Sequence, residues 1–256
     1  MRNILTLACA AAMLVSPIAM AAGLTAEQVA DRNAAARGGL AAWRAVDSMK
    51  LSGQMDAGGT PAVRLPFEMS LKRPHMSRLE LRVKDQTAVQ VYDGQQGWKQ
   101  RPFLNRDDVE AFTPQETQAA AADADLDGPL IDHARKGTRI ELAGTETVEG
   151  HQTYRLRLTH ADGRQSNLWI DAATFLDVKM DGEPRRMDNK VRKVSVFYRD
   201  YKTVDGLRMP MTLETVVEGV RQSHKISIQS VTVNPHLGEA LFAKPQPAAF
   251  RQASAR

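Results

Sequence analysis

Cysteine is almost absent from this sequence, because Cys9 is the only one among 256 residues. A single cysteine excludes an intramolecular disulfide and a cysteine-based metal centre. The six histidines offer no alternative, since none forms a His-x-His or His-Glu-x-x-His pair. We therefore expect neither a metal nor another cofactor, and a fold stabilised by its apolar core alone.

Excess charge of one sign is also small: 34 basic residues face 30 acidic ones, a formal net charge of +4. The basic residues are spread along the outward positions of candidate strands, so we expect no nucleic-acid partner. The exception is a segment around Asp188 that holds Arg185, Arg186, Lys190, Arg192 and Lys193. These residues either protect an exposed strand edge from aggregation or contact anionic membrane headgroups.

Long hydrophobic runs are missing except at the N-terminus. Arg2 precedes a twelve-residue apolar run from Ile4 to Val15, and Ala19-Met20-Ala21 has the Ala-x-Ala cleavage pattern. This predicts a signal peptide over residues 1–21, cleaved after Ala21, and export to the periplasm. An uncleaved anchor is the alternative, because no charge lies between Arg2 and Glu27. At the other end, residues 246–256 are predicted to form a disordered tail.

Catalytic motifs are lacking too. The chain has no Gly-x-Ser-x-Gly elbow and no phosphate-binding Gly-x-x-x-x-Gly-Lys loop, so we expect no enzyme. A triad assembled from distant residues stays open, because triads are recognised by geometry. Asp123–Gly128 begins like a calcium-binding EF-hand loop, but its twelfth position is Ala134. We interpret it as the junction between two helical pieces, 114–124 and 129–135.

What the chain does have is an alternation of apolar and polar residues with a period of two, which puts an apolar stripe on one face of a strand. It predicts a mainly β (α+β) fold: a single curved antiparallel sheet of about eleven strands that must curl or close to bury its apolar face, with helical lids at 24–46 and 114–135. Asp162-Gly163, Asp181-Gly182 and Asp205-Gly206 are predicted hairpin turns, and a bulge is expected near Gln229-Ser230. The predicted strands are 49–55, 62–72, 76–84, 87–92, 139–148, 152–159, 165–171, 175–181, 191–201, 207–218 and 223–233.

The apolar stripes have two interpretations. They form ordinary core, or they line a cavity for a flexible apolar ligand. Eight methionines follow the leader, and their flexible thioethers suit a wall that fits variable chains. The candidate ligand-binding residues are Val63, Leu65, Phe67, Met69, Leu71, Leu79, Leu81, Val83, Tyr154, Leu156, Leu158, Met209, Met211 and Leu213.

Several turn and strand-end motifs resemble one bacterial family. They are Tyr92-Asp93-Gly94 before Gly97-Trp98, Gly144–Gly150 before Tyr154, Leu168-Trp169-Ile170-Asp171, and Tyr198–Pro210. In order and spacing they resemble the outer-membrane lipoprotein-sorting proteins of the lipoprotein-carrier (LolA/LolB-like) superfamily.

The resemblance implies that the curved sheet forms an unclosed barrel with helices over its mouth. It also implies a carrier domain over residues 22–245 that holds acyl chains of a lipid or lipoprotein for transport to the outer membrane. Transient contact with membrane headgroups or with a membrane partner protein would accompany it. An envelope sensor with the same fold is the alternative function, and an envelope-lipid hydrolase is the least favoured.

Overall fold

The computed structural model describes residues 23–246 except 57, 59–62 and 105. The predicted signal peptide lies outside the described residues, and so does the predicted tail from residue 247 onward. Within the described part of the chain, no helix is long and apolar enough to cross a membrane.

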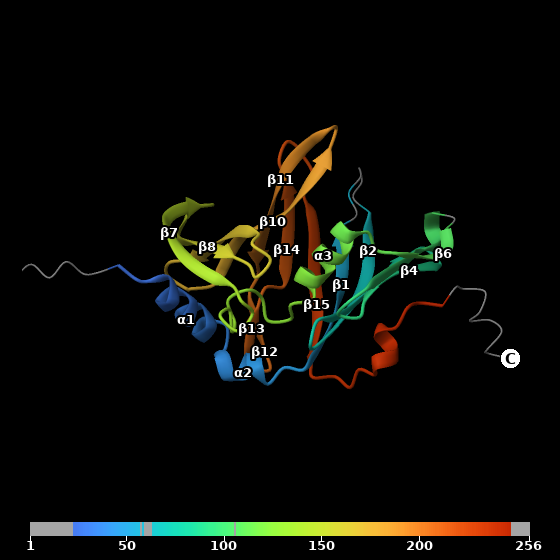
Figure 1. Ribbon diagram of the computed structural model, residues 1–256, viewed down its shortest axis with the longest axis horizontal. Coiled ribbons are helices and arrows are strands. Elements are labelled where there is room, and N and C mark those ends of the chain that lie inside the picture. Colours follow the sequence, from blue (N-terminus) through green and yellow to red (C-terminus); the bar gives the residue numbers. More distant parts are fainter. Residues whose placement is uncertain (1–22, 57, 59–62, 105, 247–256) are drawn as a thin grey trace, which may run out of the picture.

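One curved antiparallel sheet of thirteen strands dominates the molecule (Figure 1). Its strand order is β6-β5-β4-β3-β2-β1-β15-β14-β11-β10-β9-β8-β7, and the two end strands do not pair with each other. The predicted unclosed barrel is therefore confirmed. The strands of this sheet are β1 (Ser48–Asp56), β2 (Arg64–Lys72), β3 (Met76–Val83), β4 (Gln86–Tyr92), β5 (Gly97–Arg101), β6 (Arg106–Ala111), β7 (Arg139–Val148), β8 (His151–Thr159), β9 (Gln165–Asp171), β10 (Asp177–Met187), β11 (Lys190–Arg199), β14 (Thr212–Val217) and β15 (His224–Val233).

The remaining elements are few and short. A separate two-stranded hairpin pairs β12 (Lys202–Val204) with β13 (Leu207–Met209), and its turn is the predicted Asp205-Gly206. The helices are α1 (Ala26–Ala36), α2 (Leu40–Arg44), α3 (Pro114–Asp123) and the short 3-10 turns η1 (Pro102–Leu104) and η2 (Glu239–Phe242).

The strand count corrects the sequence-based expectation of about eleven. Strands β5 and β6 were not predicted, because polar residues such as Lys99 and Gln100 interrupt their alternation. The single run predicted over 207–218 divides at Pro210, which has no N–H group to donate to a strand ladder. Its first part pairs with β12, and its second part enters the main sheet as β14.

Two other expectations are wrong, and one is confirmed. The predicted turn at Asp181-Gly182 lies inside β10, where Gly182 pairs with Val194. The chain reverses instead at Asp188-Asn189, where both residues have positive φ. The segment 129–135 forms successive turns rather than a helix. The bulge near 229 is confirmed, since Ser52 pairs with Ser230 and the next residue pairs with Ile228.

Three groups of buried side chains hold helices and loops against the sheet. Helix α1 packs through Val29 and Ala30 on β8 and β9. Helix α2 packs through Trp43, together with Ile131 of the long α3–β7 loop, in one cluster with Met49 of β1 and Leu71 of β2. On the other face of the sheet, η2 packs through Phe242 on β4. These contacts leave the concave face of β2 and β3 to be covered by α3.

Candidate ligand-binding site beneath helix α3

The wall of the site is the concave face of β2, β3 and β4, and its apolar surface continues onto β1. The register places Leu51 opposite Met69, and Met69 opposite Leu79 on the next strand. Residues directly opposite in antiparallel strands lie on the same face, so the period-two stripes of these strands merge into one apolar surface. Phe67 and Leu81 pair in the same way further along. Met69, Leu79 and Leu81 are only half-buried.

Helix α3 lies over this wall (Figure 1). Thr113 caps it, accepting a hydrogen bond from the Glu116 backbone N–H at 3.2 Å, and the Glu116 carboxylate accepts one from the Thr113 backbone N–H at 2.8 Å. Pro114 occupies the first turn, where its missing N–H costs nothing. The helix is therefore well defined by its own sequence. None of its residues is buried, however, because alanine side chains project too little to fill the space above the sheet.

A cavity of about 160 Å³ separates α3 from the wall. The apolar residues that line it are Met69, Leu79, Val91, Tyr92, Phe112, Ala119 and Ala120. Four polar residues also border the cavity: Ser77, Gln90, Glu116 and Asp123. A mostly apolar hollow with several polar groups suits an amphiphile.

Two contacts fix the N-terminal end of α3. Gly97 lets the Phe112 ring lie directly against the β5 backbone, because any side chain at this position would overlap that ring. The Phe112 backbone N–H donates to the Gly97 carbonyl at 2.8 Å. Lys99 on β5 forms an ion pair with Glu116 in the first turn of α3. The aromatic ring that borders the cavity is thus held by the sheet and not by the helix.

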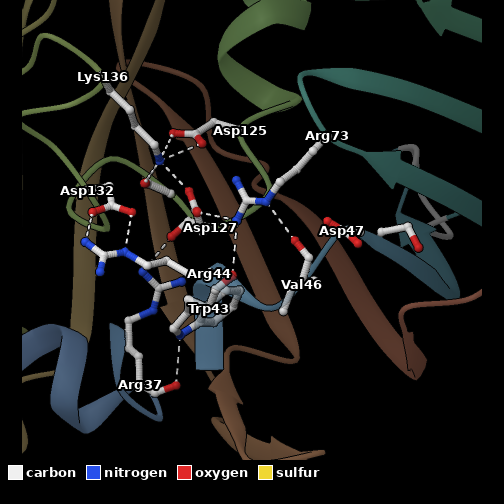
Figure 2. Close-up of polar contacts among 12 residues, drawn as sticks. Arg37, Trp43, Arg44, Val46, Asp47, Arg73, Asp125, Asp127, Asp132 and Lys136 are labelled. Atoms are coloured by element: carbon white, nitrogen blue, oxygen red, sulfur yellow. Dashed lines mark hydrogen bonds and ion pairs between the residues drawn. The ribbon is translucent and has the colours of Figure 1, made fainter. Parts of the chain in front are cut away.

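The loop that follows α3 is anchored by ion pairs, shown in Figure 2. The Lys136 ammonium donates to Asp125 Oδ1 at 2.7 Å and also pairs with Asp127. Arg73, from the β2–β3 turn, reaches Asp127 Oδ2 at 2.6 Å. We call Arg73, Asp125, Asp127 and Lys136 the latch. It binds the C-terminal end of α3 to the rim of the sheet.

The two latch carboxylates differ in their protonation. Burial raises the pKa of Asp125 to about 6, although Lys136 opposes this shift. Burial also disfavours ionised Asp127, but hydrogen bonds from Lys136 and Arg73 outweigh it and lower the pKa of Asp127. Asp127 is therefore the more acidic carboxyl of the two, and Asp125 is the one whose pKa lies above its ordinary value.

Further cations surround the latch. Arg37 donates to the Asp127 backbone carbonyl at 3.0 Å and lies over the Trp43 ring, 4.6 Å from its centroid. Arg44 pairs with Asp132. Two acidic residues of the segment that resembled an EF-hand, Asp125 and Asp127, thus contact cationic side chains. Among the described residues, no group of three or more His, Cys, Asp or Glu side chains is placed to hold a metal ion.

A second cavity of about 240 Å³ opens beside the latch. Its lining is strongly charged and includes Arg73, Arg135, Lys136, Asp127 and Asp132. Such walls do not suit an acyl chain, so the cavity beneath α3 is the better candidate site.

The structure distributes the fourteen candidate residues over different environments. Met69 and Leu79 line the cavity. Leu156 and Leu158 are fully buried in the cluster beneath α1, with Tyr154 packed against it. Leu71, Met209 and Met211 are buried in the cluster beneath α2. Phe67 is buried on β2, and Val63 is 53% exposed before that strand. The rest are half-buried: Leu65, Leu81, Val83 and Leu213.

Sequence reasoning missed the other half of the cavity. Tyr92 was placed on a strand but not in the site, and Ala119 and Ala120 were assigned only to a helix. The alanine-rich composition of the helix was the available signal. A lid without large side chains cannot fill the groove that it covers.

The class of protein follows from this geometry: an unclosed antiparallel barrel with helices across its concave face and a cavity beneath one of them. No protein-family model matches the chain, and no curated protein matches its sequence. Solved structures do match. A LolA superfamily protein from Nitrosomonas europaea is 13% identical with a TM-score of 0.60, covering 87% of this chain and 99% of that one.

Two further structures agree with it. A DUF1329 family protein from Desulfovibrio piger is 13% identical with a TM-score of 0.58, covering 85% of this chain and 97% of that one. A domain described as an outer membrane lipoprotein-sorting protein, from Vibrio parahaemolyticus, is 12% identical with a TM-score of 0.56. The match covers 86% of this chain and 96% of that one. The chain thus has the fold of LolA superfamily proteins, as its turn motifs predicted.

Proposed function

We propose that this protein is a periplasmic carrier that binds the acyl chains of a lipid or lipoprotein beneath α3 and transports them to the outer membrane. The observation that carries the proposal is the cavity between a half-buried apolar wall and a helix without buried side chains. The fold supports it, since one of the similar structures is described as lipoprotein-sorting.

The energetics of burial are sufficient without any catalytic group. Each methylene removed from water contributes about 0.8 kcal/mol, so a chain of about twelve carbons gains on the order of 10 kcal/mol before the costs of ordering. We therefore propose a binding role with no catalytic step.

The cavity must widen to take such a chain, because a hollow of about 150 Å³ holds a molecule the size of benzene. Helix α3 buries no side chain, so moving it breaks few apolar contacts. The latch holds the segment after the helix. We propose that α3 swings away from β2 and β3 while the latch keeps its C-terminal end in place.

Mass spectrometry of gently purified protein tests the proposal directly, and bound lipid or acylated peptide is the expected result. A matched pair of variants localises the site. Ala120→Leu fills part of the cavity, whereas Ala122→Leu makes the same change at an exposed position of the same helix.

We expect Ala120→Leu to weaken binding of a fluorescent fatty acid and to raise the melting temperature of the empty protein. Ala122→Leu should leave the affinity unchanged. Absence of co-purifying lipid, together with no fatty-acid binding by the wild type, would refute the carrier function. Equal losses of affinity in both variants would show that the ligand does not bind in the cavity beneath α3.

A further inference from the structure

The hairpin that joins β10 and β11 projects beyond the rest of the sheet (Figure 1). Its strands pair as far as Met187 and Lys190, and the chain reverses through Asp188 and Asn189. Positive φ at both loop residues is typical of a type I′ turn, which holds two strands in a tight, defined ribbon. All residues from 183 to 191 are exposed.

This hairpin holds the excess positive charge of the protein. Residues 184–193 contain five basic residues and one acidic residue, a net formal charge of +4, which equals that of the whole chain. In the described part of the structure, Arg185, Arg186, Lys190 and Lys193 form no ion pair with a carboxylate, whereas neighbouring Glu183 pairs with Arg164.

The register makes this concentration of charge unfavourable for the protein by itself. Arg185 lies directly opposite Arg192, and like charges in that arrangement repel. Within the molecule, Arg192 finds only the Glu218 backbone carbonyl, at 3.5 Å. An anionic surface would supply the missing counter-charges.

Two apolar side chains stand among these cations. Met187 is 39% exposed and Val191 is 65% exposed. Neighbouring register positions face opposite sides of the ribbon, so each face near the tip carries one apolar residue. A free phosphate or a nucleic acid would use the charges but not the apolar groups. A bilayer interface uses both, because phosphates meet the cations and the acyl boundary takes up the apolar side chains.

We propose that the β10–β11 hairpin docks the protein on an anionic bilayer surface, with Met187 and Val191 entering the headgroup region. This docking does not require the proposed cargo. It places one end of the sheet against the membrane, and β12–β13 lies near the opposite end (Figure 1).

The test measures partitioning of the purified protein onto vesicles of phosphatidylethanolamine with or without phosphatidylglycerol. Arg185→Ser with Arg186→Ser removes two charges from the hairpin. Lys202→Ser with Arg208→Ser removes two exposed charges from β12–β13 and is the matched control. Each basic residue near the surface contributes about fivefold to partitioning, so the hairpin variant should bind anionic vesicles about 25-fold more weakly. The control should bind like the wild type, and high salt should release every variant.

Insertion is tested separately with an environment-sensitive dye on Met187→Cys in a Cys9→Ser background. Its emission should shift to the blue on anionic vesicles, while the same dye on Arg208→Cys should not respond. Melting temperatures should be unchanged, because all of these positions are exposed. Failure of the wild type to bind anionic vesicles at low salt would overturn the proposal. Equal losses of vesicle partitioning in the hairpin and control variants would also overturn it, because they would indicate attraction by net charge alone.

Discussion

Leu79→Ala is the change that best separates a ligand-binding wall from ordinary core. Leu79 is half-buried and borders the cavity, and it lies opposite Met69 in the wall. Leu156 belongs to the same kind of alternating stripe but is completely buried beneath α1. The same substitution at the two positions should therefore have opposite consequences for binding and for stability.

The magnitudes follow from what each side chain contacts. Leucine to alanine removes about three carbon groups, so loss of contact with a bound chain costs about 2 kcal/mol, or about 30-fold in affinity. At Leu156 the loss falls on the free energy of unfolding, by about 3–5 kcal/mol, because a new cavity forms in packed core. At Leu79 the destabilisation should be smaller, about 1 kcal/mol, because a hollow already borders the side chain.

Titration with a fluorescent fatty acid gives the affinities, and urea unfolding of the ligand-free protein gives the stabilities. We expect Leu79→Ala to lose affinity with little loss of stability, and Leu156→Ala to do the reverse. If Leu79→Ala were as destabilising as Leu156→Ala and left the affinity unchanged, the wall would be core and the reasoning would fail.

Three more changes test the lid and its supports. The raised pKa of Asp125 means that the folded protein binds a proton between pH 3.8 and about 6 that the unfolded chain does not, so stability falls as pH rises through this window. In urea unfolding, Asp125→Asn should flatten that slope, so its free energy of unfolding should rise relative to that of the wild type as the pH increases through the window; an unchanged slope would contradict the raised pKa. Gly97→Ala should displace the Phe112 ring and cost about 2 kcal/mol on thermal unfolding, and unaltered stability would show that the ring moves freely. Thr113→Ala removes the cap of α3, which stabilises the helix by about 1 kcal/mol. It should speed hydrogen exchange in residues 114–123 without lowering the melting temperature of the protein. A lower melting temperature would show that the helix also supports the core.

Much of the fold could be predicted, because it depends on local signals. Alternation located most strands of the main sheet, and the Thr113 and Glu116 pattern located the start of α3. The hairpin turn was missed because Asp181-Gly182 has turn composition but lies in mid-strand. At this position a side chain in place of the glycine would press against Val194 of the neighbouring strand. Glycine is therefore required there by close packing between strands and not by a turn.

The sequence by itself determined which residues share one apolar face, because strand geometry fixes the direction of each side chain. Only the tertiary structure decided which part of that face stays uncovered. Leu156 and Leu79 have equivalent places in their strands, yet Val29 of α1 packs in the core around Leu156, while the apolar side chains that α3 brings to the cavity beside Leu79 are only those of Ala119 and Ala120. The same holds for the latch, where Arg73 reaches Asp127 from 54 positions earlier in the sequence. Burial depends on which segment the completed chain places opposite a residue, and no local pattern contains that information.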